Sequence, residues 1–509
     1  MTAPPPPPPI LDLPRGTRLR AGRGEAEVLP TIDFETYSPA GYRWDADKGR
    51  WASAPKRGLK LVGTAKYAEH PETEILCLAY DMKDGRGPTL WLPGEPPPSR
   101  LLAHIASGGL VESHNAAFER AIWAEVCVKR LDWPPFPAAQ WRCSMAKARA
   151  HALPGKLADA APLVGTDARK DPRGKALLDK YSTPRNPTKT DSSLRALPID
   201  PALYEYCLSD IAAEAELSAR VPDLSPDELE YWQADQEINA RGVAVDTAAV
   251  SACAALLDDV AAHAAHRVSR ATNGEITSPA QVAALRKWLA ARGVHTDDLD
   301  GDTVDALLAD PELDPFGEIA EVLSARAAVA SASVKKTKAI AALACADGRV
   351  RNLFVYHGAR TGRATGADVQ PTNLPRGGCK LWRCAACGRH SGAVDCRWCG
   401  AGGGKPVKDW SVEIVDEALG LIGSRSRRLV EHVYGDPLGA MAGCLRGLFV
   451  AAPGHELIGS DYTAIEAVVL AALAGEEWRL DVFRSHGKIY EASRSEEHTS
   501  ELQSRFGIS

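Results

Sequence analysis

From Val28 to about Leu217, apolar runs of strand length alternate with segments in which apolar residues recur every three or four positions. The strand-like runs are VLPTIDFET, EILCLAYDM and TLWLPG, and the helical segments include LLAHIASGG and FERAIWAEVCVKRL. Strands that alternate with helices along a chain usually pack as one sheet with helices on its faces. The pattern therefore predicts an α/β domain.

The next stretch, residues 225–345, is almost wholly helical in pattern. Its segment SPAQVAALRKWLAARG carries a helix start and a Gly stop. A third region begins near Val350, is interrupted by a Gly- and Cys-rich stretch at 377–405, and resumes at VKDWSVEIVDEALGLI. We find no repeat of 20–50 residues along the chain.

Near the C-terminal end, an apolar run ends at Asp461 and a helical pattern follows it. The spacing i, i+3, i+4, i+7 and i+8 predicts a helix with a buried apolar stripe. The stripe consists of Ile465, Val468, Val469, Ala472 and Leu473. The run before Asp461 predicts a strand, and a carboxylate between a strand end and a helix start is well placed to bind a metal ion.

The bulk composition is that of an ordinary soluble protein, with 45% hydrophobic and 25% charged residues among 509. The net charge of −6 excludes a global basic signature for nucleic acid. Any such binding has to come from local patches, such as Lys335, Lys336 and Lys338 or Arg360 and Arg363.

The apolar runs do not predict a membrane protein, because none approaches the roughly 18 residues that span a bilayer. The opening segment TAPPPPPPILDL also lacks the charged-then-apolar layout of a signal peptide. We therefore expect a cytoplasmic protein without a membrane partner. Residues 1–27, which are Pro-rich and then Arg/Gly-rich, predict a disordered lead-in.

Cysteine spacing predicts a zinc ribbon inserted at residues 377–406. Two C-x₂-C pairs separated by eight residues form two knuckles whose four thiolates can close tetrahedrally on Zn²⁺. The predicted ligands are Cys384, Cys387, Cys396 and Cys399. Cys379 and His390 are expected to be bystanders, and free buried thiols are the alternative. The sequence does not decide whether the ribbon stabilises a loop or contacts nucleic acid.

A set of acidic residues accompanies the α/β pattern. In TIDFETYS, Asp33 and Glu35 stand at i and i+2 on an apolar strand, so both carboxylates point to one face. In SHNAAFERAIW, Asn115 and Glu119 lie at the start of a helix. Carboxylates in pairs can hold Mg²⁺ ions for phosphodiester cleavage. Each motif alone is also compatible with a structural role, such as a solvated strand end.

The segment DPALYEYCLSDIAAEAEL completes this set. Asp200 is a predicted N-cap with Pro201 at the first helical position. Tyr206 and Asp210 follow at i and i+4, on one helix face.

In this order and spacing, the three segments resemble the motifs of the DEDD superfamily of 3′–5′ exonucleases, in its tyrosine-containing branch. The resemblance covers about residues 28–220 and implies an RNase H-like fold, a mixed sheet with flanking helices. By the same resemblance, Asp33, Glu35, Glu119 and Asp210 hold two Mg²⁺ or Mn²⁺ ions. Tyr206 would orient the attacking water, and Asn115 would help to position the site.

One residue departs from the family pattern. The family usually has Asp where this chain has Glu119. The extra methylene can shift a ligand by about 1 Å, a displacement that can reduce the rate around 10²-fold. The sequence leaves open whether Glu119 supports full activity.

Two further segments, YHGARTGRATGADVQPTNLPRG and SDYTAIEAVVLAAL, resemble the family A DNA polymerases of phage and prophage type. The former is similar to the palm segment that tracks the primer–template, and the latter is similar to motif A. The resemblance implies that Asp461 is a catalytic metal ligand, that the Tyr462 carbonyl lies beside it and that Glu466 is the steric gate against ribonucleotides. It also implies DNA or nucleotide contacts by Lys335, Lys336, Arg360, Arg363, Gln370 and Asn373.

The two resemblances together predict a domain order. The expected parts are an exonuclease domain at 28–220, a helical thumb-like region at 221–345, the start of a palm at 346–376, the ribbon at 377–406, and the palm with motif A and the start of the fingers at 407–493. Single-stranded and primer–template DNA and deoxynucleoside triphosphates are the expected partners.

The final segment, residues 494–509, has no core-forming pattern. Its letters RSEEHTSELQS resemble the conceptual translation of a sequencing-library adapter. We therefore expect an assembly artefact after Ser493, and a gene that continues into a fingers helix and a His-Asp-Glu motif. Without those motifs the chain as given is expected to lack polymerase activity.

Two alternative functions remain open at this level. One is a stand-alone exonuclease with a degenerate palm. The other is a non-catalytic nucleic-acid-binding protein that uses the ribbon and the thumb-like region.

Overall fold

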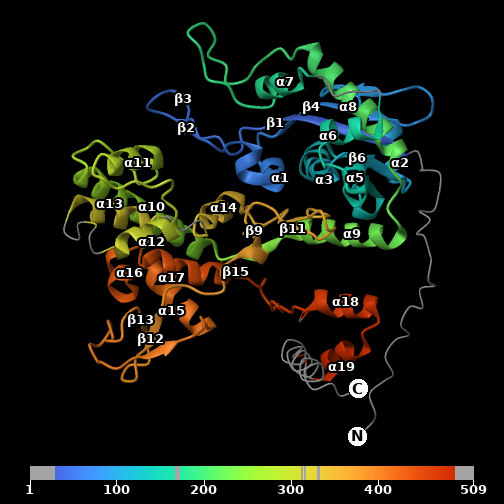
Figure 1. Ribbon diagram of the computed structural model, residues 1–509. Coiled ribbons are helices and arrows are strands. Elements are labelled where there is room, and N and C mark those ends of the chain that lie inside the picture. Colours follow the sequence, from blue (N-terminus) through green and yellow to red (C-terminus); the bar gives the residue numbers. More distant parts are fainter. Residues whose placement is uncertain are drawn as a thin grey trace. The chain divides into compact units, whose positions relative to one another are not determined.

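The computed structural model describes residues 29–166, 172–310, 313, 317–329, 333–462, 464–485 and 487. They belong to two compact units, one through Val450 and one from Ala451 onward (Figure 1). The predicted disordered lead-in, residues 1–27, and the predicted adapter-derived segment, residues 494–509, lie outside the described residues.

We call residues 29–220 the first region. A five-stranded sheet with the order β5-β4-β1-β6-β7 lies at its centre. Its strands are β1 (Thr31–Tyr37), β4 (Glu74–Asp81), β5 (Thr89–Trp91), β6 (Val111–Ser113) and β7 (Trp141–Cys143). The central strand β1 pairs antiparallel with β4 and parallel with β6. The prediction of a mixed sheet with flanking helices is therefore confirmed. A separate hairpin is formed by β2 (Trp44–Asp45) and β3 (Arg50–Trp51).

Alternation along β1 gives the sheet two different faces. Ile32 and Phe34 point into a large apolar core that includes Trp123. The opposite face is covered by helix α8 (Pro201–Arg220), whose Cys207 packs on Cys77 of β4. The residues of β1 that lie between the core positions therefore face α8.

Shorter helices surround this sheet (Figure 1). They are α1 (Leu59–Glu69), α2 (Ser99–Ala106), α3 (Ala116–Ile122), α4 (Lys129–Leu131), α5 (Ser144–Ala150), α6 (Leu157–Ala160) and α7 (Gly174–Tyr181), with a π-helical stretch at Trp123–Val128 between α3 and α4. Helix α8 begins where the sequence predicts. The Asp200 carboxylate accepts a hydrogen bond from the Ala202 N–H at 3.0 Å, and Pro201 occupies the first turn.

The helical region that follows is also as predicted. It contains α9 (Pro226–Arg241), α10 (Thr247–Ala271), α11 (Val282–Ala290), α12 (Gly301–Ala309), α13 (Glu318–Ala327) and α14 (Lys336–Leu343). A short strand, β8 (Val243–Val245), lies between β9 (Arg349–Val350) and β15 (Phe449–Val450) in a three-stranded sheet.

Helix α10 corrects one expectation. By length and composition it is apolar enough to cross a membrane, although the apolar runs in the sequence did not predict one of that length. Its apolar face packs inside the protein, with Val250 and Leu256 in one core and Ala264 and Val268 in another. A long core helix passes the same test as a membrane span, because both need a continuous apolar surface.

One apolar core joins α10 and α14 to the region beyond Val350. That region contains β10 (Phe354–Val355), β11 (Thr365–Gly366), β12 (Leu381–Arg383), β13 (His390–Ser391), β14 (Lys405–Val407), α15 (Val412–Gly423), α16 (Arg427–Tyr434) and α17 (Pro437–Cys444). The strands β13, β12 and β14 form a small antiparallel sheet, and Leu381 of β12 anchors it in the common core.

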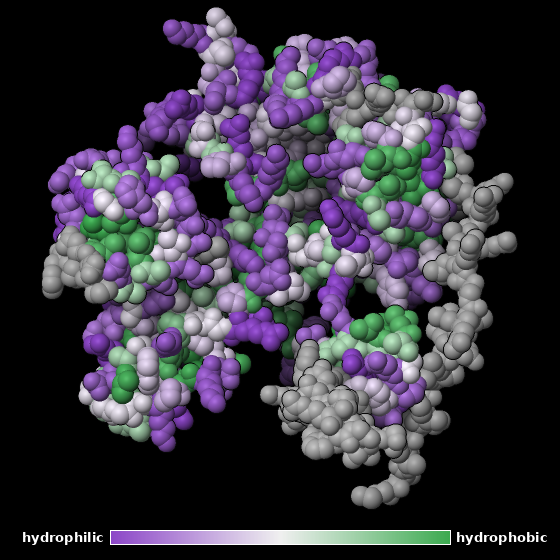
Figure 2. Space-filling model, in the orientation of Figure 1, coloured by the Kyte–Doolittle hydropathy of each residue, from purple (hydrophilic) through white to green (hydrophobic). Residues whose placement is uncertain are grey.

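The second unit contains α18 (Ile465–Ala474) and α19 (Glu477–Ser485). The predicted helix after Asp461 is present, but the predicted strand before it is wrong, since no strand forms over the described residues 451–462. The predicted buried stripe is also wrong. Leu473 is 77% exposed, and Ala471 is the buried residue of α18. Figure 2 shows apolar surface, in green, over α18. Within this unit the described residues offer α18 only α19 to pack against, too little to bury a full apolar face.

Candidate functional sites

Asp33 and Glu35 lie on the face of β1 that is covered by α8, as the period-2 alternation predicts. Their carboxylates and the Cys207 thiol all lie within 4.8 Å of one another. The Cys207 Sγ is 3.6 Å from Asp33 Oδ2 and 3.6 Å from the Asp33 carbonyl oxygen. Cys207, which was not predicted as a site residue, is buried and contacts Asp33 from the α8 side.

Helix α8 brings Tyr206 and Asp210 to the same face of the sheet. The Tyr206 hydroxyl donates a hydrogen bond to the Asp210 carboxylate. Burial raises the pKa of Tyr206, and the charges of Asp210 and Glu35 raise it further. The phenol therefore stays protonated. Gly174 makes room for this ring, because a Cβ at that position would come within 2.2 Å of a Tyr206 ring carbon.

Glu119 reaches the same place from the first turn of α3. It is 3% exposed, and its Oε2 atom has no hydrogen-bond partner among the described residues. Burial raises the pKa of Glu119 well above its ordinary value, and the nearby Asp33 charge adds to the shift. Asn115, the residue before this helix, has a φ of 72° and lies at the wall of the cavity described below.

A further buried carboxylate, Glu214, was missed in the sequence. It lies one turn beyond Asp210 on α8 and accepts a hydrogen bond from the Ser144 hydroxyl at 3.1 Å. Ser144 is in turn 2.8 Å from Nδ1 of His114. Burial raises the pKa of Glu214, and the charges of Glu112 and Asp33 raise it further. The spacing of Tyr206, Asp210 and Glu214 at i, i+4 and i+8 was the available signal.

A cavity of about 650 Å³ opens beside three of these carboxylates, while Glu35, Glu119 and Tyr206 do not line it. Asp33, Asn115, Asp210 and Glu214 line one side of it. Arg149 and Lys156 add cationic groups, and Phe354 and Tyr356 add aromatic rings from the β10 segment. Sequence reasoning did not assign Phe354 or Tyr356 to this site.

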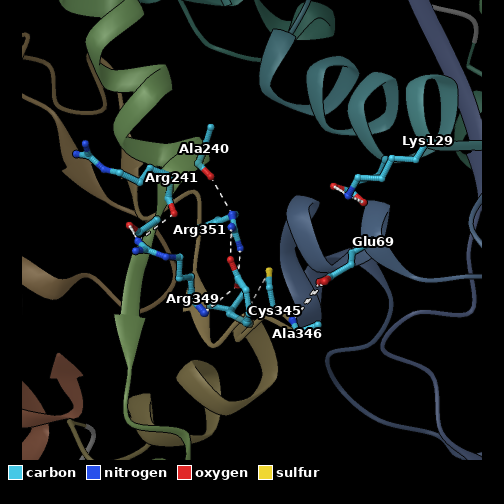
Figure 3. A network of polar contacts seen from close by, with 12 residues as sticks. Glu69, Lys129, Ala240, Arg241, Cys345, Ala346, Arg349 and Arg351 are labelled. Atoms are coloured by element: carbon cyan, nitrogen blue, oxygen red, sulfur yellow. Dashed lines mark hydrogen bonds and ion pairs between the residues drawn. The ribbon is translucent and has the colours of Figure 1, made fainter. Parts of the chain in front are cut away.

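The β10 segment is held in place by a polar network around residues 345–351 (Figure 3). The Ala346 N–H donates to the Glu69 carboxylate of α1 at 3.3 Å. Arg351 donates to the Ala240 carbonyl of α9 at 2.8 Å and pairs with Asp347 at 2.9 Å. In the chain that follows, the Phe354 N–H donates to Asn239 of α9 at 2.9 Å, and the Tyr356 hydroxyl donates to Glu228 of α9.

The residues assigned to DNA contacts by the polymerase resemblance are brought together in part. The Lys336 Nζ lies 3.5 Å from the Gln370 carbonyl and 3.3 Å from the Asn373 carbonyl. Arg360 and Arg363 are exposed, and both lie in the segment between β10 and β11. Lys335 is the residue directly before α14, next to Lys336, and its side chain makes no capping hydrogen bond with any described residue.

The motif A residues belong to the second unit. Asp461 and Tyr462 precede α18, and Glu466 lies in its first turn. All three are exposed within this unit.

The cysteine cluster forms as predicted. The four Sγ atoms of Cys384, Cys387, Cys396 and Cys399 lie within 4.8 Å of one another. The Cys384–Cys399 and Cys387–Cys396 sulfur pairs are 3.7 and 3.6 Å apart. Four thiolates at the usual Zn–S distance of about 2.3 Å form a tetrahedron with edges of about 3.8 Å. The sulfur positions therefore fit a zinc ion.

The backbone around the cluster favours a thiolate at Cys384, whereas hydrogen bonds with the neighbouring thiols raise the pKa of Cys387 to about 12. The N–H groups of Cys387 and Ala386 point at the Cys384 sulfur and lower its pKa to about 7. Cys379 and His390 stand outside the cluster, as expected. His390 instead lies 3.0 Å from the Glu417 carboxylate of α15.

No family model matches this chain. Over 449 residues the chain is 33% identical to the DNA polymerase of Bacillus phage SP02. The match covers 86% of this chain and 63% of the relative, so the chain spans less than two thirds of the relative's length.

A solved structure of the POL domain of Pol1 from M. smegmatis, in complex with DNA primer-template and dNTP, also shows a likeness. It is 16% identical and covers 60% of this chain and 50% of that one, with a TM-score of 0.35. A TM-score this low does not establish a common fold. The resemblance to a phage DNA polymerase, which the motifs predict, is confirmed by the Bacillus phage relative.

Proposed function

We propose that this chain belongs to a DNA-directed DNA polymerase of family A, phage type, and that its residues 28–220 form a 3′–5′ exonuclease for single-stranded DNA ends. The similarity to a phage DNA polymerase supports the first part. The observation that carries the second part is the presence of Asp33, Asp210 and Glu214 from β1 and α8 at one cavity. Glu35 lies beside Asp33, and the buried Glu119 of α3 is close enough for the Asp33 charge to raise its pKa.

This carboxylate cluster fits divalent cations. Glu119 is buried with an oxygen that has no hydrogen-bond partner in the part of the chain that the structure describes, and the Asp33 charge raises the pKa of both Glu119 and Glu214. Such a cluster is unfavourable without a counter-charge, and oxygen ligands suit Mg²⁺ and Mn²⁺. Asp33, Glu35, Glu119 and Asp210 would hold the ions, which supply charge stabilisation and an activated water for phosphodiester hydrolysis.

The protein groups around the cluster have separate roles in this proposal. Tyr206, which is protonated and fixed by Asp210, orients the attacking water. Asn115 lies at the cavity wall, where it can contact the terminal nucleotide. Arg149 and Lys156 attract the phosphates, while Phe354 and Tyr356 offer rings on which unpaired bases can stack.

The polymerase part of the proposal uses the remaining segments. Residues 221–345 act as a thumb-like region, and residues 346–376 and 407–493 contribute to the palm. Asp461 would be a catalytic metal ligand, with Tyr462 and Glu466 at the incoming nucleotide. The proposed primer–template contacts are Lys335, Lys336, Arg360, Arg363, Gln370 and Asn373. The four-cysteine ribbon would hold structural zinc, and the protein would work in the cytoplasm.

The exonuclease proposal is tested with a 5′-labelled single strand and Mg²⁺ or Mn²⁺. The wild-type chain is expected to shorten the strand from its 3′ end and give a series of shorter labelled products. Asp33→Ala should abolish these products. Asp81→Ala is the matched control, because Asp81 lies on the neighbouring strand and pairs with Lys83 outside the cluster. A strand that survives the wild-type chain, or equal cleavage by Asp33→Ala, contradicts the proposal. Metal-dependent cleavage also excludes the non-catalytic alternative.

A further inference from the structure

The inserted ribbon carries an unusual concentration of positive charge. Residues 376–409 contain seven Lys or Arg residues against two acidic residues, whereas the whole chain has a net charge of −6. We call the seven side chains the ribbon cations. They are Arg376, Lys380, Arg383, Arg389, Arg397, Lys405 and Lys408.

The ribbon cations are all exposed. Within the described part of the chain, none of them forms an ion pair. Elsewhere many arginines are paired, as in the bidentate contact of Arg267 with Glu321 at 2.8 Å. The inserted segment therefore carries seven exposed positive charges that no ion pair among the described residues neutralises, although Glu417 of α15 contacts His390 at its edge.

Strand register places two of these charges side by side. Arg383 of β12 is directly opposite Lys405 of β14. Directly opposed side chains share one face of a sheet, and like charges in such a pair destabilise it. A bound polyanion removes this repulsion. A zinc ion with four thiolates carries a charge of −2, which leaves the ribbon positive.

The ribbon is also rigidly mounted. The Gly392 N–H donates to the Val433 carbonyl of α16 at 2.9 Å, and a Cβ on Gly392 would come within 1.9 Å of the Tyr434 carbonyl oxygen. The Trp398 indole donates to the His390 carbonyl at 2.8 Å, and the Arg389 guanidinium lies 4.5 Å above the Trp398 ring. The charges are therefore presented from a fixed platform, which lowers the entropy lost on binding.

We propose that the ribbon cations bind the phosphate backbone of DNA. The surface is distinct from the carboxylate cavity and adds a second DNA contact to the chain. Single-stranded and duplex DNA present the same phosphates, so the experiment has one arm for each. The choice of DNA as the polyanion rests on the proposed function. The experiment measures binding alone, so it can fail while exonuclease activity is present, and the reverse.

The test uses the full chain carrying Asp33→Ala, so that the DNA is not degraded. Fluorescence anisotropy measures the affinity for a labelled single strand and a labelled duplex over a series of salt concentrations. The double variant Arg383→Ser/Lys405→Ser should lower the affinity about tenfold at moderate salt. It should also reduce the slope of log affinity against log salt by about 1.4 for single strands or about 1.8 for duplex.

The control variant is Lys60→Ser/Lys189→Ser, which removes the same charge from two other exposed positions without an ion pair. It should leave both affinity and slope close to the starting values. Zinc content verifies that the ribbon remains folded in each variant. If both double variants change the slope equally, or neither changes it on either DNA, the ribbon cations do not contact phosphates. A ribbon that binds an acidic protein instead would leave the slope unchanged in both variants.

Discussion

The carboxylate cluster and the cysteine cluster differ in how the chain builds them. The carboxylates come from β1, α3 and α8, with Asp33 and Asp210 separated by most of the first region. The cysteines come from one short segment, Cys384 to Cys399, and face each other across two knuckles. One cluster depends on a folded sheet and its covering helices, and the other depends mainly on local turns.

The difference extends to solvent and charge. Glu119 and Glu214 are buried and repel Asp33, so their cluster is unfavourable until a cation arrives. The Cys384 thiol is already poised for ionisation by backbone N–H groups. The first arrangement suits exchangeable catalytic ions, and the second suits a resident structural ion.

The largest expected effect is at Asp210. Asp210→Asn removes the negative charge of a proposed ligand and weakens the acceptor of the Tyr206 hydroxyl, and should reduce the exonuclease rate about 10³-fold. Glu214→Gln, one turn further on the same helix, keeps the Ser144 contact and should reduce the rate much less. Single-turnover cleavage of a labelled strand measures both. Equal losses would place Glu214 among the ligands and change the assignment.

Glu119→Gln is expected to reduce the rate about 10²-fold. The same variant has a second, opposite effect on stability without metal. The pKa of Glu119 is raised in the folded state, so ionisation destabilises the fold as the pH rises from below the ordinary value of 4.5 through the folded pKa.

The metal-free variant should therefore melt higher than wild type at pH 8, and the two should converge at low pH. Adding Mn²⁺ should reverse the order at pH 8. Thermal melts with and without Mn²⁺ measure this, and a variant that melts lower at pH 8 without metal would contradict the buried, repelled carboxylate.

Gly174→Ala tests the packing around Tyr206. A Cβ at this position would come within 2.2 Å of the ring, so the ring must shift and the rate should fall about tenfold. Gly301→Ala is the control, because Gly301 also begins a helix but has no atom within 4 Å of the added Cβ. If the two variants are equally active, the Tyr206 position does not limit the reaction.

The smallest effect on cleavage is expected from the cysteine cluster. Cys396→Ser should abolish binding of one zinc ion while leaving the exonuclease rate within about twofold, since distant sites act independently. Cys379→Ser, a nearby cysteine outside the cluster, should retain the zinc. Metal analysis and the cleavage assay are made on the same samples. Full zinc retention by Cys396→Ser would refute the four-thiolate site.

Features that depend on local sequence could be predicted, and features that depend on distant parts of the chain could not. The cysteine spacing, the Asp200 cap and the common face of Asp33 and Glu35 are local features, and the structure confirms each one. Phe354 and Tyr356 could not be assigned to the cavity, because residues of α9 that are distant in sequence hold them there. The Asn239 side chain bonds the Phe354 backbone, and the Tyr356 hydroxyl donates to Glu228.

The predictions that were wrong concern features that depend on tertiary packing. The expected strand before Asp461 and the buried stripe of α18 both require partners that the described second unit does not supply. Helix α10 has the composition of a membrane span, yet its apolar face is buried by other helices. Hydrophobic periodicity predicts that a helix or strand forms, but it does not predict which part of the protein buries its apolar face.

The most direct test of the exonuclease site is to locate its ions. Crystals grown in Mn²⁺ should show anomalous scattering between Asp33, Glu35, Glu119 and Asp210, and the signal should be lost in Asp33→Ala. An absence of Mn²⁺ from these carboxylates, with Mn²⁺ bound elsewhere in the same crystals, would contradict the account.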